Sequence, residues 1–253
     1  EITEVTDRVC KRAGRALLFD NVSGYGVPVL MNAFGSARRM AMALGVDDLN
    51  EVAERIEQML HRTPPDSLLD RVRTLTEMFR LGKFFPRRTG DGRCKQVVRR
   101  GGDVNLFAMP ILKCWPGDAG RFITLPMVFT RDPDTGARNV GMYRMQVYDR
   151  ATTGMHWHVH KTGADHFRRY CDRGERMPVA VALGSDPAVT YAATAPLPPG
   201  LDEIVFAGFL RSRPVDLVAC ETTDLEVPAD AEYVLEGYID PHELRREGPF
   251  GDH

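Results

Sequence analysis

Residues 122–148 of the chain have the sequence FITLPMVFTRDPDTGARNVGMYRMQVY. Two β-like runs, 122–130 and 140–148, flank a segment rich in Asp, Pro and Gly that is typical of a turn. Similar short runs lie on both sides of this stretch, at 95–100, 154–160, 179–183, 215–219 and 232–238. Many short strands, interrupted only by predicted helices at 165–173 and 201–211, indicate an antiparallel sheet or barrel rather than a parallel, doubly wound sheet.

The part before residue 94 has a different pattern. Ser36 is a candidate N-cap for a helix that ends at Gly45. The segment from Phe85 to Asp91 is rich in Arg, Pro and Gly, so it is the predicted linker between domains over 1–90 and 91–253. Within the first domain the sequence predicts strands at 16–20 and 27–32 and helices at 4–13, 37–44, 48–61 and 65–81.

The composition excludes several classes of protein. The 253 residues are 43% hydrophobic and carry 33 Lys and Arg against 35 Asp and Glu, which argues against nucleic-acid binding through bulk positive charge. No run of about 18 apolar residues is present, so we expect no membrane span. The first residues do not form a signal peptide, and five cysteines without a CxxC pair predict free thiols in a reducing cytoplasm. The sequence lacks an initiator Met, and we expect it to be a piece of a longer chain.

Four of the seven histidines lie between residues 156 and 166. If 154–160 is a strand, its period of two places His156, His158 and His160 on one face, with Trp157 on the other. Imidazoles at positions i and i+2 can share one metal ion. A solvated strand face is the alternative, and spacing alone gives the two equal weight.

Two further groups of polar residues could carry chemistry. Asn139 offers a hard oxygen ligand, and Arg144 offers a planar fork for a carboxylate or phosphate. A regular strand puts the two side chains on opposite faces, however, and a turn Asn with a surface Arg is the simpler interpretation. Glu203 follows a Pro-Pro-Gly segment at a predicted helix start, where acids commonly serve only the helix dipole. Glu247 and Asp252 lie on a Gly/Pro-shaped loop and could divide acid and base roles in a cleft.

Other active-site motifs are missing: the sequence has no Walker loop, GxGxxG after a strand, GxSxG or HExxH. Mononucleotide hydrolysis, nicotinamide binding on a Rossmann unit and serine hydrolase chemistry therefore lose support.

A series of motifs in order along the whole chain resembles the UbiD decarboxylase family. These motifs are EITE (1–4), ALLF (16–19), CWP (114–116), NVGMYR (139–144), MPV (177–179), ALG (182–184), DLEVPA (224–229), LEGY (235–238) and EGPFGDH (247–253). The resemblance implies an α+β fold, with a small N-terminal α/β domain followed by an FMN-binding split β-barrel domain. A C-terminal α/β domain used in oligomer contacts would follow the GDH, outside this chain.

The resemblance also implies an activity, the reversible, non-oxidative decarboxylation of an aromatic or other unsaturated carboxylic acid. The cofactors would be prenylated FMN, a divalent ion usually assigned as manganese, and often potassium. By position, the catalytic group falls on Arg144, Glu247 and Asp252, and the metal ligands fall on Asn139, His160 and Glu203. His158 and Lys161 remain alternatives to His160. Cofactor contacts are implied at the metal ligands and at Met142, Tyr143, Arg144, His156, Trp157, His158 and Lys161.

The resemblance further implies a cytoplasmic homo-oligomer supplied with its cofactor by a flavin prenyltransferase. The 4-hydroxy-3-polyprenylbenzoate of ubiquinone synthesis is one candidate substrate, which would add peripheral membrane contact, and a smaller phenolic or heteroaromatic acid is another. The histidine-rich segment 156–161 departs from the ubiquinone enzyme's pattern and weakens the polyprenyl candidate. Two alternative functions are a non-catalytic flavin-binding or assembly fragment and a metal-dependent hydrolase that uses the histidine strand.

Overall fold

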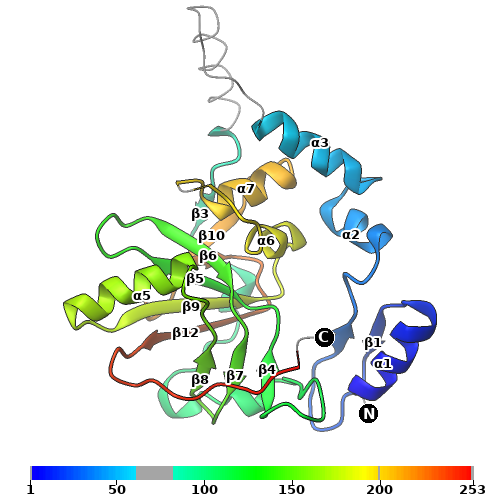
Figure 1. Cartoon of the computed structure of the whole chain (residues 1–253), viewed down its shortest axis with the longest axis horizontal. Helices are drawn as coiled ribbons and strands as arrows, with labels where there is room; N and C mark the ends of the chain where they lie inside the picture. Colours follow the sequence, from blue (N-terminus) through cyan, green and yellow to red (C-terminus); the bar gives the residue numbers. More distant parts are fainter. Residues whose placement is uncertain (1, 61–81, 199, 252–253) are drawn as a thin grey trace, which may run out of the picture.

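The computed structural model describes residues 2–60, 82–198 and 200–251, so the predicted helix 65–81 lies outside the described residues. The N-terminal part forms an arm beside the sheets (Figure 1), built from α1 (Ile2–Ala13), the hairpin β1 (Leu17–Phe19) and β2 (Val29–Met31), α2 (Ala37–Leu44) and α3 (Leu49–Leu60). The boundaries predicted for α2 are confirmed. The Ser36 side chain accepts a hydrogen bond from the Arg39 N–H, and Gly45 ends the helix at φ 68°, in the left-handed region.

The remainder of the chain is built mainly on antiparallel sheets. The largest has the order β12-β9-β5-β6, and a three-stranded sheet has the order β4-β7-β8. A third, β11-β10-β3, contains the one parallel pairing among the described strands, between β10 and β3. The bounds are β3 (Arg87–Thr89), β4 (Arg121–Ile123), β5 (Met127–Arg131), β6 (Arg138–Met142), β7 (Met145–Val147), β8 (Thr153–Met155), β9 (Met177–Leu183), β10 (Asp216–Ala219), β11 (Glu226–Pro228) and β12 (Tyr233–Ile239).

The stretch quoted first forms a long hairpin that bends from one sheet into the other. Each predicted strand is divided in two, β4 and β5 on one side and β6 and β7 on the other. The first break contains Pro126, which has no N–H to donate to a ladder. The second break consists of Tyr143 and Arg144, so these two residues lie at the corner between the sheets.

Helices cover the large sheet, and apolar side chains fill the space between. The helices are α5 (Thr162–Arg173), α6 (Pro187–Ala192) and α7 (Glu203–Leu210), with 3-10 turns at Arg93–Lys95, Gly101–Asp103 and Leu106–Ala108. Successive side chains of β5 point to opposite faces of the sheet and so enter two different apolar clusters. Met127 and Phe129 belong to the cluster that includes Ile204 of α7. Val128 instead joins the cluster of Tyr143 and Met145 on the other face.

Several local predictions were wrong. Residues 95–100 form no strand, and β8 ends at Met155 rather than continuing to residue 160. The predicted linker 85–91 contains β3, which pairs with β10 although 126 residues separate Thr89 from Asp216 along the chain. The sequence also gave no sign of α6 or β11. Within the described ranges, no helix is both long and apolar enough to cross a bilayer.

Candidate active site

A buried polar group forms where β5, β6 and α5 meet. Asn139 on β6 lies opposite Thr130 on β5, and its Nδ2 donates to Thr130 Oγ1 at 3.3 Å. Thr130 Oγ1 is also 3.0 Å from Nδ1 of His166 on α5. Asn139, Thr130 and His166 are all buried. Because His166 uses Nδ1 for this contact, its Nε2 remains available for another partner.

Glu203 enters this group from the first turn of α7. Asp202 caps the helix through the N–H groups of Ile204 and Val205. Glu203 in turn accepts a hydrogen bond from the Val140 amide at 3.1 Å, one residue after Asn139. Burial raises the pKa of Glu203 above its ordinary value, against backbone hydrogen bonds that lower it. A half-buried carboxylate of this kind favours a nearby cation.

Tyr143 connects Glu203 and Asn139 to the corner between the sheets. Burial raises its pKa, while hydrogen bonds from the Asn139 side chain and the Gly163 amide oppose the rise, and the charge of Glu203 adds to it. The Tyr143 ring occupies space that side chains at two glycines would need. A Cβ at Gly141 would lie 2.2 Å from Tyr143 Oη, and one at Gly163 would lie 3.0 Å from the ring.

The corner's second residue, Arg144, binds Glu247 through two hydrogen bonds. Arg144 Nε lies 2.9 Å from Glu247 Oε1, and Arg144 Nη2 lies 3.1 Å from Oε2. His156 Nδ1 is 3.0 Å from the same Oε2. Burial raises the pKa of Glu247, but the hydrogen bonds and charges of Arg144 and His156 outweigh it, so the pKa lies below its ordinary value.

Every residue of the segment 247–251 contacts the β4-β7-β8 sheet or the residues that flank its strands. The Gly248 amide donates to Gln146 Oε1 at 2.8 Å, and the Gly251 amide donates to the buried Asp118 at 2.9 Å. Pro249 accepts from the Ala119 amide at 2.8 Å. The Phe250 ring packs on Phe122 and lies beneath the Arg144 guanidinium. Figure 1 shows this segment passing the ends of β8, β7 and β4. Asp252 itself lies outside the described residues.

The histidines predicted to share a strand face do not do so. The chain leaves β8 at Met155, and His158, His160 and Lys161 are exposed just before α5. The His158 and His160 rings lie 5.8 Å apart between centroids. Among the described residues, no group of three or more His, Cys, Asp or Glu side chains could hold a metal ion. A hydrolase site based on these histidines therefore lacks a third ligand in the described part of the chain.

Of the remaining predicted contacts, Trp157 is the most informative. Its ring packs between Tyr143 and Phe167, with centroids 6.0 and 5.4 Å away. Its Nε1 is buried and has no hydrogen-bond partner among the described residues. Met142, at the end of β6, is half-buried and packs against the large core cluster. A buried donor without a partner is expensive, so Trp157 Nε1 is suited to an acceptor from a bound group.

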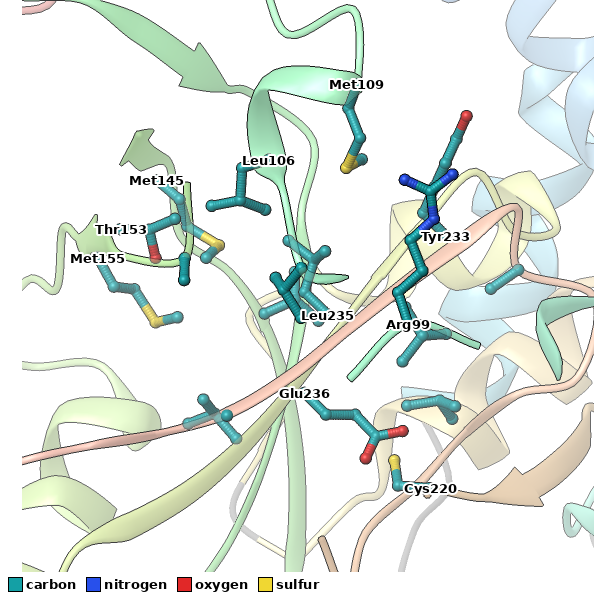
Figure 2. Close-up of a pocket in the computed structure, with 18 of the residues that line it drawn as sticks. Arg99, Leu106, Met109, Met145, Thr153, Met155, Cys220, Tyr233, Leu235 and Glu236 are labelled. Atoms are coloured by element: carbon teal, nitrogen blue, oxygen red, sulfur yellow. The ribbon is translucent and has the colours of Figure 1, made fainter. Parts of the chain in front are cut away.

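A large open groove of about 2190 Å³ lies along β12, between it and β7 and β8. In Figure 2, Leu235 faces Leu106 and Met145 across this groove, while Glu236 points to the opposite side of β12, toward Cys220. Of the described site residues predicted from the sequence, only Trp157 and Glu247 line it. The hydrogen-bonded groups around Asn139 and Arg144, rather than this groove, therefore define the candidate site.

Sequence reasoning missed Thr130 and His166. His166 belongs to the histidine cluster noted in the sequence. It lies on a helix, predicted from residue 165 onward, whose other residues include many charged side chains. Its burial depends on the packing of α5 against β5 and β6, which no local pattern reveals. The register of β5 with β6 could have indicated Thr130, since it places this residue opposite Asn139.

Comparison with known proteins gives the family. The model of the 3-octaprenyl-4-hydroxybenzoate carboxy-lyase Rift-related domain matches residues 87–253, and that of the corresponding N-terminal domain matches residues 1–59. A protein of Archaeoglobus fulgidus is 52% identical over 254 residues, covering 100% of this chain and 52% of its own length. The chain thus spans about half the length of the curated relatives it matches.

Solved structures agree. The UbiD-class enzyme HmfF from Pelotomaculum thermopropionicum, in complex with FMN, has 31% identity and a TM-score of 0.82, covering 98% of this chain and 52% of that one. An evolved dimeric form of HmfF, in complex with prFMN, has 30% identity and a TM-score of 0.81, covering 98% and 54%. Vanillic acid decarboxylase from Sedimentibacter hydroxybenzoicus has 29% identity and a TM-score of 0.82, covering 100% and 52%. The chain therefore belongs to the UbiD family of prenylated-FMN-dependent decarboxylases.

Proposed function

We propose that the whole protein catalyses the reversible, non-oxidative decarboxylation of an aromatic or other unsaturated carboxylic acid. The observation that carries the proposal is the pairing of Arg144 with Glu247 directly after Tyr143, which borders the buried Asn139 and the half-buried Glu203. A guanidinium suited to a carboxylate, next to a group of hard ligands suited to a cation, supports the proposal.

We propose that Asn139, Glu203 and His166 hold a divalent ion, with manganese as the candidate, and that potassium is a second ion of the cofactor site. The donor set fits, because amide oxygen, carboxylate and imidazole suit such a cation, and a phosphate of the cofactor would complete it. The resemblance implied His160 as the imidazole ligand, with His158 and Lys161 as alternatives. We now favour His166, because it is buried and joined to Asn139 through Thr130, whereas His160 is exposed.

The bound prenylated FMN would supply the electron sink that makes loss of CO₂ possible. The roles of the chain's own residues follow from their positions. Arg144, held by Glu247, would orient the leaving carboxylate, and Asp252 would deliver the proton that replaces CO₂. Met142, Tyr143, His156, Trp157, His158 and Lys161 are proposed to lie along the cofactor.

The finer description of the protein is part of the proposal. Domains over 1–90 and 91–253 would correspond to an α/β domain and a flavin-binding split barrel, with a further α/β domain in the whole protein. We propose a cytoplasmic homo-oligomer that receives its cofactor from a flavin prenyltransferase. A smaller phenolic or heteroaromatic acid is the favoured substrate, and 4-hydroxy-3-polyprenylbenzoate of ubiquinone synthesis is the second candidate.

The test is to express the whole protein together with a flavin prenyltransferase, record its absorption spectrum, and screen aromatic, heteroaromatic and acrylic acids for CO₂ release. We expect bound flavin and turnover of at least one acid. Asp252→Asn should reduce turnover by about a hundredfold or more while leaving flavin bound. A whole protein that binds no flavin would refute the proposal, and zinc in place of flavin would favour the hydrolase.

A further inference from the structure

The β7-β8 ladder places a histidine beside the arginine of the site. The last pair of the ladder is Met145 with Met155, and the His156 amide then donates to the Arg144 carbonyl at 3.1 Å. The pairing therefore extends by one residue and puts His156 opposite Arg144, at the corner between the sheets. Side chains opposite each other on antiparallel strands lie close enough to interact or to share a partner.

Glu247 is the shared partner. Its Oε1 accepts a hydrogen bond from Arg144 Nε. Its Oε2 accepts one from Arg144 Nη2 at 3.1 Å and lies 3.0 Å from His156 Nδ1. An ionised carboxylate only accepts hydrogen bonds, so Nδ1 of His156 must carry the proton in this arrangement. The Glu247 side chain is 11% exposed and the His156 side chain 50%, so the glutamate is largely shielded from water while the imidazole reaches solvent.

The other groups that face Glu247 do not replace this contact. Burial raises the pKa of Tyr148, and the charge of the nearby Glu247 raises it further. Its hydroxyl, however, donates to the Arg246 carbonyl at 2.8 Å. Arg245 lies over the Tyr148 ring and pairs with Glu243. Of the described residues, Arg144 and His156 therefore provide the hydrogen bonds to the Glu247 carboxylate.

We propose that His156 is a positioning residue that holds Oε2 of Glu247, keeps this glutamate ionised, and so keeps the Arg144 guanidinium oriented for a substrate carboxylate. The resemblance implied only a cofactor contact for His156, and the role in the reaction rests on the proposed function of Arg144. If Glu247 became protonated, it would lose acceptor capacity toward both neighbours, and Arg144 would lose the charge that fixes it.

The first test measures Glu247 directly and needs no turnover. Glutamate labelled with ¹³C at the carboxyl is titrated by NMR in the chain, and Glu247→Gln identifies the signal. We expect the Glu247 midpoint to rise by about one pH unit in His156→Phe, which has no donor. His156→Asn places an amide N–H near the position of Nδ1 and should recover at least half of the shift. His242→Asn, at an exposed histidine outside the site, is the control. An unchanged midpoint in His156→Phe would overturn the proposal.

The second test uses the whole protein loaded with prenylated FMN and the acid identified in the screen. Activity that needs ionised Glu247 falls as the pH drops through the pKa of this glutamate. His156→Phe should therefore move the acidic limb of the kcat/KM profile to higher pH, by the shift seen in the titration. His156→Asn should restore the wild-type profile. A shifted titration with an unmoved acidic limb would overturn the positioning role. If the wild type showed no turnover, the proposed function would fail, and the titration would still decide the Glu247 contact.

Discussion

Replacing Gly141 by alanine is the sharpest test of the packing around Tyr143. The new Cβ would lie 2.2 Å from Tyr143 Oη and 2.3 Å from Cζ, far inside contact distance. The ring cannot simply move aside, because it is buried, packs on Trp157, and is held at its hydroxyl by the Gly163 amide. The substitution must therefore displace either the ring or strand β6.

The expected cost has two parts. Overpacking in a filled core costs about 1–3 kcal/mol, and losing the hydrogen bond from the Gly163 amide to Tyr143 Oη, 3.3 Å long, adds roughly 1 kcal/mol. Alanine's better strand propensity returns about 0.5–1 kcal/mol. We therefore expect a loss of about 1–3.5 kcal/mol, which for a chain of this size lowers Tm by roughly 2–14 °C.

The assay is thermal and urea unfolding followed by circular dichroism. Gly237→Ala is the matched control, since Gly237 also lies in a strand of the large sheet and a Cβ there would meet nothing within 4 Å. The control should be neutral or slightly stabilising. If Gly141→Ala proved as stable as Gly237→Ala, the Tyr143 ring could not occupy the position described, and the link from Asn139 to Arg144 would lose its support.

Three further predictions concern the buried polar groups. Thr130→Val should destabilise the fold by about 2 kcal/mol, because Asn139 and His166 lose a buried partner. Urea unfolding measures this loss, and a value below about 0.5 kcal/mol would contradict the prediction. Burial raises the pKa of Asp132, but hydrogen bonds from its turn and the Arg169 charge outweigh it, so the pKa is lowered. Its stabilisation is therefore present above the unfolded pKa of about 3.9 and is lost as pH falls through the lower folded value. The Tm difference between wild type and Asp132→Asn should shrink from pH 6 toward pH 2 (about the range of that titration), and a constant difference would oppose this assignment. In the whole protein, the variants Asn139→Ala and Glu203→Gln should each lose the divalent ion and bind the flavin less tightly. Elemental analysis measures the metal and absorption measures the flavin. Full metal content in both variants would refute the ligand assignment.

Local chemistry predicted much of the fold. The Ser36 side chain caps the start of α2, and Gly45 ends it in the left-handed conformation. Both roles depend on the residue itself, so the bounds of this helix could be predicted from the sequence. The alternating and continuous apolar runs likewise located most strands. The bends were not predictable in the same way, because Tyr143 favours strands and nothing in Arg144 breaks one. Only the change from one sheet to the other takes these two residues out of the ladder.

The site was harder to predict for the same reason. The pattern alone put Asn139 and Arg144 on opposite faces of one strand, whereas the break after Met142 ends that strand and removes the conflict. His156 had been grouped with His158 and His160 by spacing. The end of β8 instead leaves His156 beside Arg144 and the other two exposed. These pairings depend on strand register and helix packing over long separations, which residue type and spacing do not encode.

The most direct test of the account is an anomalous difference map from crystals of the whole protein grown with manganese and prenylated FMN. We predict a manganese peak contacted by Asn139, Glu203 and His166, with the flavin ring extending toward Arg144 and Glu247. Manganese bound instead at His158 and His160, or a flavin phosphate far from Asn139, would contradict it.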